Sequence, residues 1–255
     1  MDKEHQYQEL IADVKQFYER DKKLHEHEKV YLTWWDECKE INLWTYWQGR
    51  GNLSARIMLV GQDWGNLGNL SSPYMKQFEE INSGKRSSFW MDEESITDKN
   101  LIALFSSIGD YKISREMPYN PDLFFTNFIL GYRNHGLSGG FKQRWLRENK
   151  DFFRRLAEII EPEIIICLGR NAFCGVMMAF DRKVRIGSYN AFIVGKENPV
   201  ELTLPSGKFV FVFAEAHCGA MGTLNRNRLK DPDGLKDIDL QKKDWQRIKQ
   251  YLDLL

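Results

Sequence analysis

The sequence predicts a layered α/β fold with a mainly parallel central sheet, and three observations carry this prediction. Short, continuous apolar runs such as 57–61 and 163–168 are typical of strands that are buried on both faces. Segments with apolar residues at helical spacing, above all 144–160, separate these runs. Strands and helices that alternate in this way form a mostly parallel sheet covered by helices.

The N-terminal elements begin with two helical segments. Residues 5–20 and 30–49 carry apolar positions at helical spacing, and the second segment is rich in tryptophan. The Gly-Arg-Gly-Asn sequence at 49–52 is expected to end that helix. A buried strand is expected over 57–61, and the Gly-, Asn- and Ser-rich stretch 65–72 predicts a loop after it.

The middle of the chain continues the alternation. The polar stretch 82–99 is expected to be irregular, and 100–108 is suited to a short helix. A strand over 123–128 follows. The amphipathic helix over 144–160 ends before Pro162, and the strand over 163–168 comes directly after it.

The C-terminal elements complete the sheet. A helix is expected over 171–180 and an edge hairpin over 183–194. Residues 200–204 and 209–213 alternate around a Pro-Ser-Gly turn, which predicts a second hairpin. The last helix is expected over 240–254.

Length and composition limit the class of protein. The 255 residues include 36 Lys and Arg against 36 Asp and Glu, so the net charge is zero, which argues against a protein that coats nucleic acid nonspecifically. The apolar runs are far shorter than the ~18 residues of a membrane span, and no signal segment follows the charged N-terminus. We expect one cytoplasmic domain, 1–255, with 1–50 as a helical extension packed on it. The four cysteines show no Cys-x-x-Cys pair, and we expect reduced thiols.

Three loops at strand ends carry the chemistry, because parallel α/β sheets bind ligands beyond the carboxyl ends of their strands. After the first strand, Asp63 offers a carboxylate that could orient water, although a turn or cap aspartate is the alternative. After the second, Asn127 stands in an apolar stretch, and its amide either matches one edge of a nucleobase or braces neighbouring loops. After the last, His217 precedes a run of small residues, and Arg226 and Arg228 could bind phosphate.

Between about Ala55 and Arg228, five segments resemble motifs of the uracil-DNA glycosylase superfamily and occur in the same order as in that family. The segments are Gly61-Gln62-Asp63, then Thr126-Asn127 with Arg133-Asn134, then the helix–strand–helix run from Glu158 to Ala172, then 207–212, and finally His217 with Arg226. The resemblance implies a three-layer α/β/α sandwich that hydrolyses the N-glycosidic bond of a flipped-out uracil or other damaged base during DNA repair. It implies that Asp63 positions water, Asn127 reads the base and His217 assists departure of the base anion.

The resemblance also implies which residues surround the base and the DNA. The residues expected to contact the base are Gly61, Gln62, Trp64, Tyr74 and Asn127. The residues expected to contact DNA are Gly65, Asn66, Met221, Leu224, Arg226 and Arg228, with Met221 or Leu224 as an apolar wedge or, alternatively, as a side chain buried under the loop. The uracil-specific branch has Pro and Tyr where Trp64 and Gly65 stand here, which leaves strict uracil specificity in doubt.

No cofactor or metal is expected. The iron–sulfur branch holds its cluster with four cysteines, but Gly131 stands near one of those places and 144–160 contains no cysteine. The sequence His-Glu-His-Glu at 25–28 is typical of a solvated face. Residues 141–155 hold six basic side chains against two acidic ones, a local surplus that either steers DNA or forms a charged outer helix face.

Two functions from different classes remain open. The first is a DNA glycosylase that uses Asp63, Asn127 and His217. The second is a catalytically silent homologue that binds nucleic acid or a nucleotide. An unrelated α/β hydrolase is least favoured, because the chain lacks a Gly-x-Ser-x-Gly elbow and a phosphate-binding Gly-x-x-x-x-Gly-Lys loop.

Overall fold

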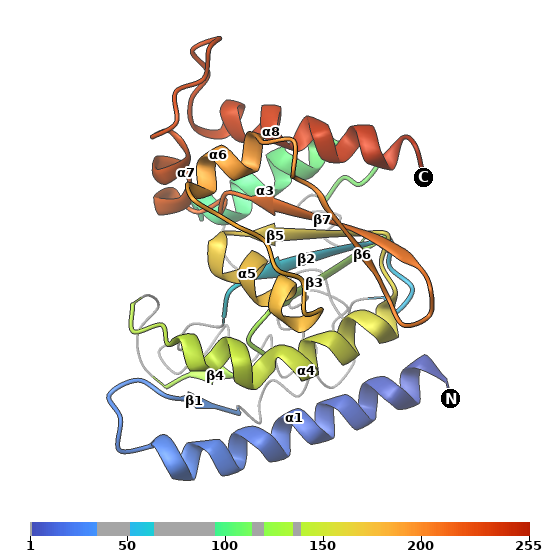
Figure 1. The fold of residues 1–255 in the computed structure, drawn as a ribbon, viewed down its shortest axis with the longest axis vertical. Coiled ribbons are helices and arrows are strands. Elements are labelled where there is room, and N and C mark those ends of the chain that lie inside the picture. Colours follow the sequence, from blue (N-terminus) through green and yellow to red (C-terminus); the bar gives the residue numbers. More distant parts are fainter. Residues whose placement is uncertain (1, 35–51, 64–94, 114–119, 135–138) are drawn as a thin grey trace.

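A five-stranded sheet forms the centre of the molecule (Figure 1), seen in a computed structural model that describes residues 2–34, 52–63, 95–113, 120–134 and 139–255. Its strands lie in the order β3-β2-β5-β7-β6. Neighbours among the first four are parallel, and β6 pairs antiparallel with β7. The strands are β2 (Ile57–Gly61), β3 (Leu123–Asn127), β5 (Ile164–Leu168), β6 (Val200–Thr203) and β7 (Phe209–Glu215). The expected mainly parallel sheet is confirmed.

Each central strand contributes side chains to two separate hydrophobic cores, which explains why its sequence is apolar throughout. In β2, Met58 and Val60 join one core, whereas Ile57 and Leu59 join the other. The strand has this double burial because successive side chains point to opposite faces of a sheet. In β5 the same alternation places Ile165 in the first core and Ile166 in the second.

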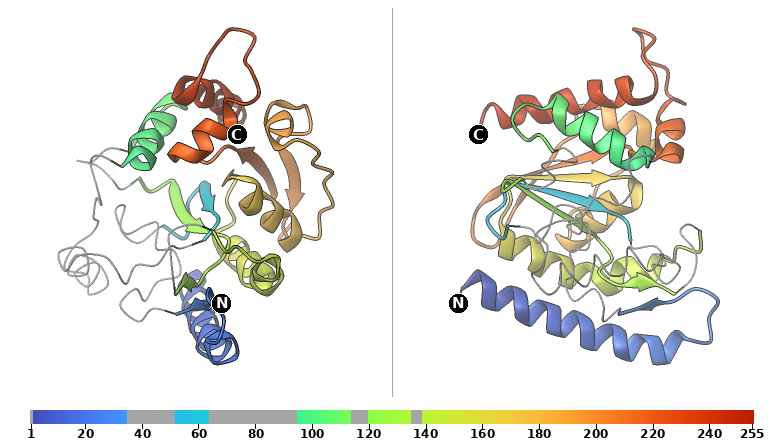
Figure 2. Two further views of the ribbon diagram at one scale, coloured as in Figure 1. Left: turned by 90° about the vertical axis from the view of Figure 1, so that its left-hand side faces the viewer. Right: turned by 180° about the vertical axis from the view of Figure 1, so that it is seen from behind.

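Helices cover both faces of the sheet, as the three views together show (Figures 1 and 2). Helices α4 (Gln143–Ile160) and α5 (Arg170–Ala179) supply the first core, and α3 (Ile96–Ser107) and α8 (Asp237–Leu252) supply the second. Helix α1 (Lys3–His25) runs along α4 and adds Tyr7, Leu10, Val14 and Tyr18 to the first core. The fold is therefore a layered α/β arrangement around two apolar cores.

Helix α4 ends where its sequence predicts. Glu161 adopts a left-handed conformation, with φ 54°, and its N–H donates to the Ala157 carbonyl oxygen. Pro162 follows and cannot continue the helical hydrogen-bond pattern. The turn leads directly into β5, whose Ile164 N–H donates to the Arg56 carbonyl oxygen beside β2.

Three sequence-based expectations are wrong. The stretch 82–99, expected to be irregular, contains at its end the start of helix α3 at Ile96, with Ser95 as its cap. The hairpin expected over 183–194 is replaced at its end by helix α6 (Tyr189–Val194), which begins at Ser188, whose side chain accepts a hydrogen bond from the Ala191 N–H. The helix expected from residue 30 is replaced at its start by β1 (Leu32–Thr33), which pairs antiparallel with β4 (Tyr132–Arg133). The remainder of that expected helix, 35–49, lies outside the described residues.

Cys167, Cys174 and Cys218 are free thiols, and Cys38 lies outside the described residues. Across the part of the chain that the structure describes, no helix has both the length and the apolar character needed to cross a bilayer.

Candidate functional site

The three predicted loops meet at the carboxyl edge of the sheet. Gly61 and Asn127 are register partners at the ends of β2 and β3, and Leu168 and Glu215 are partners at the ends of β5 and β7. Because these strands are parallel, the loops that follow them leave the sheet on the same side. Asp63, Asn127 and His217 are therefore brought to one edge by the pairing of strands that are distant in sequence.

Asp63 is a buried carboxylate held by a buried arginine. Its side chain is 8% exposed, and its Oδ2 accepts hydrogen bonds from Arg133 Nε at 2.9 Å and from Gln62 Nε2 at 3.0 Å. Burial raises the pKa of Asp63, while the Arg133 guanidinium opposes the rise by stabilising the ionised form. Within the described residues, the hydrogen bonds from Arg133 and Gln62 all reach Oδ2.

The Arg133 side chain is itself fixed from three directions. It is 3% exposed, its guanidinium lies 5.5 Å from the ring centre of Trp145, and its Nη1 donates to the Gly139 carbonyl oxygen. Sequence reasoning placed Arg133 only within a family-like segment and missed its partnership with Asp63. Nothing in the local sequence indicates the pair, because Arg133 belongs to β4 and lies 70 positions after Asp63.

Asn127 closes β3 and is 1% exposed. The next two residues tie the second loop to the first, because the Phe128 N–H donates to the Gly61 carbonyl oxygen and the Ile129 N–H donates to that of Gln62. These bonds fix the backbone that follows Asn127 relative to the Asp63 loop.

Gln62 connects the same loop to α5. Its Oε1 accepts a hydrogen bond of 2.6 Å from Asn171 Nδ2, while its Nε2 donates to Asp63. Its amide therefore helps to orient the carboxylate, and the expected contact of Gln62 with a base stays a prediction.

His217 has its neutral tautomer selected by the backbone. The Gly219 N–H donates to His217 Nδ1 at 2.9 Å, so in the neutral ring the proton lies on Nε2. Desolvation lowers the pKa of His217 and favours this neutral form, while the nearby Asp63 carboxylate opposes that effect. The ring is therefore set up as a neutral hydrogen-bond donor within electrostatic reach of Asp63.

The small residues after His217 permit a close approach of the backbone. A Cβ atom on Gly222 would lie 2.0 Å from the His217 carbonyl oxygen, and one on Gly219 would lie 3.0 Å from His217 Nδ1. The absence of a side chain at these two glycines lets the short helix α7 (Ala220–Arg226) lie directly against the His217 backbone. On the other side, Gln241 Nε2 of α8 donates to the His217 carbonyl oxygen at 3.2 Å.

His217 lines a pocket of about 660 Å³, which is large enough for a small organic ring system, but neither Asp63 nor Asn127 is among its described lining residues. Its polar lining includes Tyr189 and Asn190 of α6, Asn225 of α7 and the exposed Arg228. Sequence reasoning missed the two α6 residues because it assigned that segment to a hairpin. Ser188, which caps the helix, was the available signal.

The expectation that Arg226 binds phosphate is corrected by the structure. Arg226 is 2% exposed, and its Nε and Nη2 donate to the two carboxylate oxygens of Asp244 at 2.6 and 2.8 Å. This bidentate pair joins α7 to α8 and leaves the guanidinium unable to reach a surface phosphate. Arg228 is exposed, as are Met221 and Leu224 at 69% and 58%. The alternative that the last two are buried under the loop is therefore wrong.

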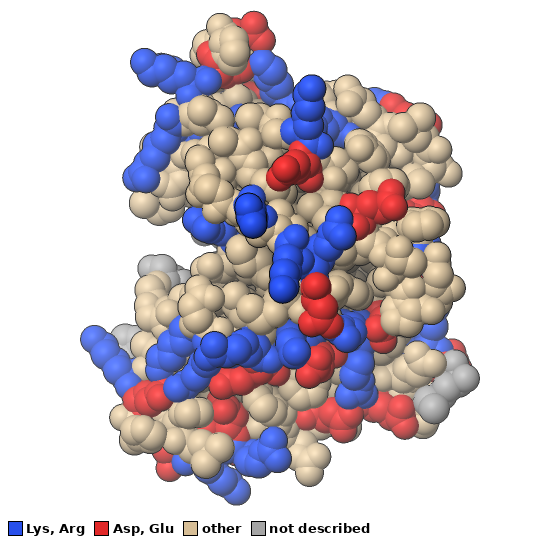
Figure 3. All heavy atoms as spheres, viewed as in Figure 1, with Lys and Arg blue, Asp and Glu red and all other residues tan. Residues whose placement is uncertain are grey.

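The basic surplus expected over 141–155 is balanced by acidic residues from other elements. Lys142 and Arg144 both bind Glu28, Arg154 binds Asp181 at 2.7 Å, and Arg155 binds Asp13 at 2.7 Å. In Figure 3 basic and acidic side chains are interspersed over the lower part of the molecule. The structure thus favours a charge-balanced helix face over a DNA-steering patch.

Four of the predicted contact residues, namely Trp64, Gly65, Asn66 and Tyr74, lie outside the described residues.

The comparisons with known proteins add no assignment. No model of a known protein family matches the chain, and a search of curated proteins finds no similar sequence. The functional conclusion therefore depends on the geometry of this site.

Proposed function

We propose that the protein is a DNA glycosylase that hydrolyses the N-glycosidic bond of a flipped-out uracil or other damaged base. The observation that carries the proposal is the hydrogen bond from the Gly219 N–H to His217 Nδ1, which leaves the proton of neutral His217 on Nε2, at the edge of the sheet that also holds Asp63. Cleavage of this bond develops positive charge on the sugar and negative charge on the departing base. An N–H donor and a carboxylate oppose these two charges as they grow.

In this proposal His217 acts on the leaving base, and Asp63 acts on the water and the sugar. His217 donates a hydrogen bond to an oxygen of the leaving base. Asp63, held through Oδ2, uses its other oxygen to orient the attacking water and to stabilise the cationic sugar. Asn127 reads the edge of the base, because a primary amide offers both a donor and an acceptor.

Helix α7 supplies the proposed contact with DNA. Met221 and Leu224 are exposed on one short helix directly after the His217 loop, where an apolar side chain could fill the space that a flipped base vacates. Arg228 lines the pocket and is exposed, so its guanidinium is free to contact a phosphate.

A catalytically silent protein that binds nucleic acid or a nucleotide is the second candidate. The ion pair between Asp63 and Arg133 favours it, because a paired carboxylate is a weaker partner for water and for a cationic sugar. In this alternative, the pocket beside His217 would bind a base without chemistry.

One experiment separates the two functions. The protein is incubated with duplexes and single strands that contain uracil, thymine mismatches, hypoxanthine, xanthine or alkylated bases, and alkali-induced scission reports base loss. Retention of each labelled oligonucleotide is measured in parallel. Base loss from at least one substrate supports the glycosylase, whereas retention without base loss from any substrate supports the binding protein.

A further inference from the structure

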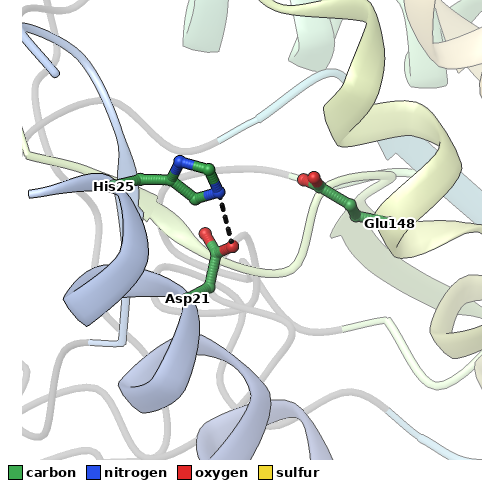
Figure 4. A group of neighbouring side chains, drawn as sticks. All are labelled: Asp21, His25 and Glu148. Carbon is green, nitrogen blue, oxygen red and sulfur yellow. Dashed lines mark ion pairs between the residues drawn. The ribbon is translucent and has the colours of Figure 1, made fainter.

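A second cluster of chemically active side chains lies between α1 and α4, apart from the strand-end site. Asp21 and His25 are one helical turn apart on α1, and the Glu148 carboxylate reaches toward them from α4 (Figure 4). One ligand atom from each residue lies within 4.8 Å of the others. Among the described residues no other group of His, Cys, Asp or Glu side chains approaches this closely.

The carboxylates of this cluster are incompletely satisfied by protein atoms. The Asp21 side chain is only 7% exposed, and its Oδ2 has no hydrogen-bond partner in the described part of the chain. The buried Oε2 of Glu148 also lacks one. An ionised oxygen that is buried without a donor is costly. A bound cation would remove this cost.

The imidazole of His25 lies between two carboxylates. Its Nε2 faces Asp21 Oδ1 at 3.4 Å, while its Nδ1 lies 3.3 Å from Glu28 Oε1. Arg144 holds Glu28 with two hydrogen bonds of 2.7 Å, and Lys142 also binds it. The Nδ1 atom is buried and has no hydrogen-bond partner in the described part of the chain, so its contact with Glu28 is not a hydrogen bond.

We propose that Asp21, His25 and Glu148 bind a divalent transition-metal ion of the zinc class. One imidazole nitrogen with two carboxylate oxygens is a set that zinc accepts, with a water in the fourth position, whereas Mg²⁺ and Ca²⁺ prefer oxygen alone. Zinc bonds of about 2.0–2.1 Å in a tetrahedron separate the ligand atoms by roughly 3.3–3.4 Å. The distance from His25 Nε2 to Asp21 Oδ1 already matches this edge.

The ion would join two helices that are distant in sequence. Asp21 and His25 belong to α1, which runs along α4 and also contacts the sheet through the Tyr7–Phe124 ring pair. A metal bridge to Glu148 would fix the C-terminal turn of α1 on α4. The proposed role is structural, and it does not depend on the activity of the strand-end site.

Metal titration of tag-free protein tests this proposal. After removal of metals with a chelator, the protein is titrated with ZnCl₂ in a calorimeter and, separately, with CoCl₂ while visible absorption is recorded. We expect one equivalent of Zn²⁺ to bind and Co²⁺ to give the absorption bands of a low-symmetry N/O site. His25→Ala should abolish binding, and Glu148→Gln should weaken it at least about tenfold.

His27→Ala is the matched control, because His27 lies two residues away and is exposed. It should bind Zn²⁺ as the wild type does. With Zn²⁺ at about one hundred times its dissociation constant, the thermal midpoint of wild type and control should rise by roughly 5–10 °C, and that of His25→Ala should not change. Glu148→Gln preserves shape and serves as the decisive variant if His25→Ala does not fold.

Two results would overturn the metal site. One is a wild-type protein that takes up neither Zn²⁺ nor Co²⁺. The other is a loss of binding in His27→Ala equal to the loss in His25→Ala or Glu148→Gln.

Discussion

At the scale of single residues, the strand-end site depends on hydrogen bonds that fix one atom of each side chain and leave another atom available. The Gly219 N–H occupies Nδ1 of His217, and Arg133 with Gln62 occupies Oδ2 of Asp63. The proposed reaction uses the remaining polar atom of each residue, Nε2 of His217 and Oδ1 of Asp63. The same residues could be chosen from sequence as candidates, but not the atoms that would act.

The pH dependence of base release follows from these two residues. The proposed reaction needs neutral His217 and ionised Asp63, and burial lowers the pKa of the first and raises that of the second. Acid protonates both, so the rate should be constant near neutral pH and fall only as the pH decreases. A pH–rate profile under single-turnover conditions tests this. A rate that increases on acidification would show that imidazolium, not imidazole, is the active form.

The buried pair of Arg226 and Asp244 should contribute to stability and not to DNA binding. Asp244→Ala would leave the guanidinium buried without its partner, which costs about 3–5 kcal/mol in comparable sites. Unfolding in urea, compared with the exposed variant Arg228→Ala, measures the difference. Equal free energies of unfolding for the two variants would contradict the structural role.

At the scale of secondary-structure elements, the local sequence pattern predicted most helices and strands. It failed to predict side-chain contacts, because these depend on partners that are distant in sequence. The strands β2, β3 and β5 were predictable because burial on both faces requires continuous apolar runs. The acidic partners of the basic residues on α4 were not predictable, because they belong to other elements. Asp13 lies in α1, Glu28 follows α1, and Asp181 follows α5. Arg226 was assigned to DNA for the same reason, because Asp244 lies 18 residues further on.

Helix α7 carries an element-scale prediction. If Met221 and Leu224 act as a wedge, replacing both by alanine should slow base loss from duplex substrate more than from single-stranded substrate, because only the duplex must be unstacked. The ratio of the two rates is the measurement, and it cancels any general loss of activity. An unchanged ratio would argue that these side chains only cover the loop.

At the scale of the whole molecule, stability comes from the two apolar cores that the sheet separates. Leu59 is 1% exposed in the second core, so Leu59→Ala should lower the free energy of unfolding by about 2–5 kcal/mol. Leu254→Ala, at a position that is 83% exposed, is the control and should change stability little. Similar denaturation midpoints for the two variants would contradict this layered description.

The central claim is that the carboxyl edge of this sheet forms a glycosidic active site. The most direct test is the single-turnover rate of base release from the substrate that the wild type processes fastest, measured for His217→Ala with His27→Ala as a surface control. Loss of a hydrogen bond formed mainly in the transition state should lower the rate about 10²–10³-fold, and the control should match the wild type. A His217→Ala protein that releases the base at the wild-type rate would contradict the claim.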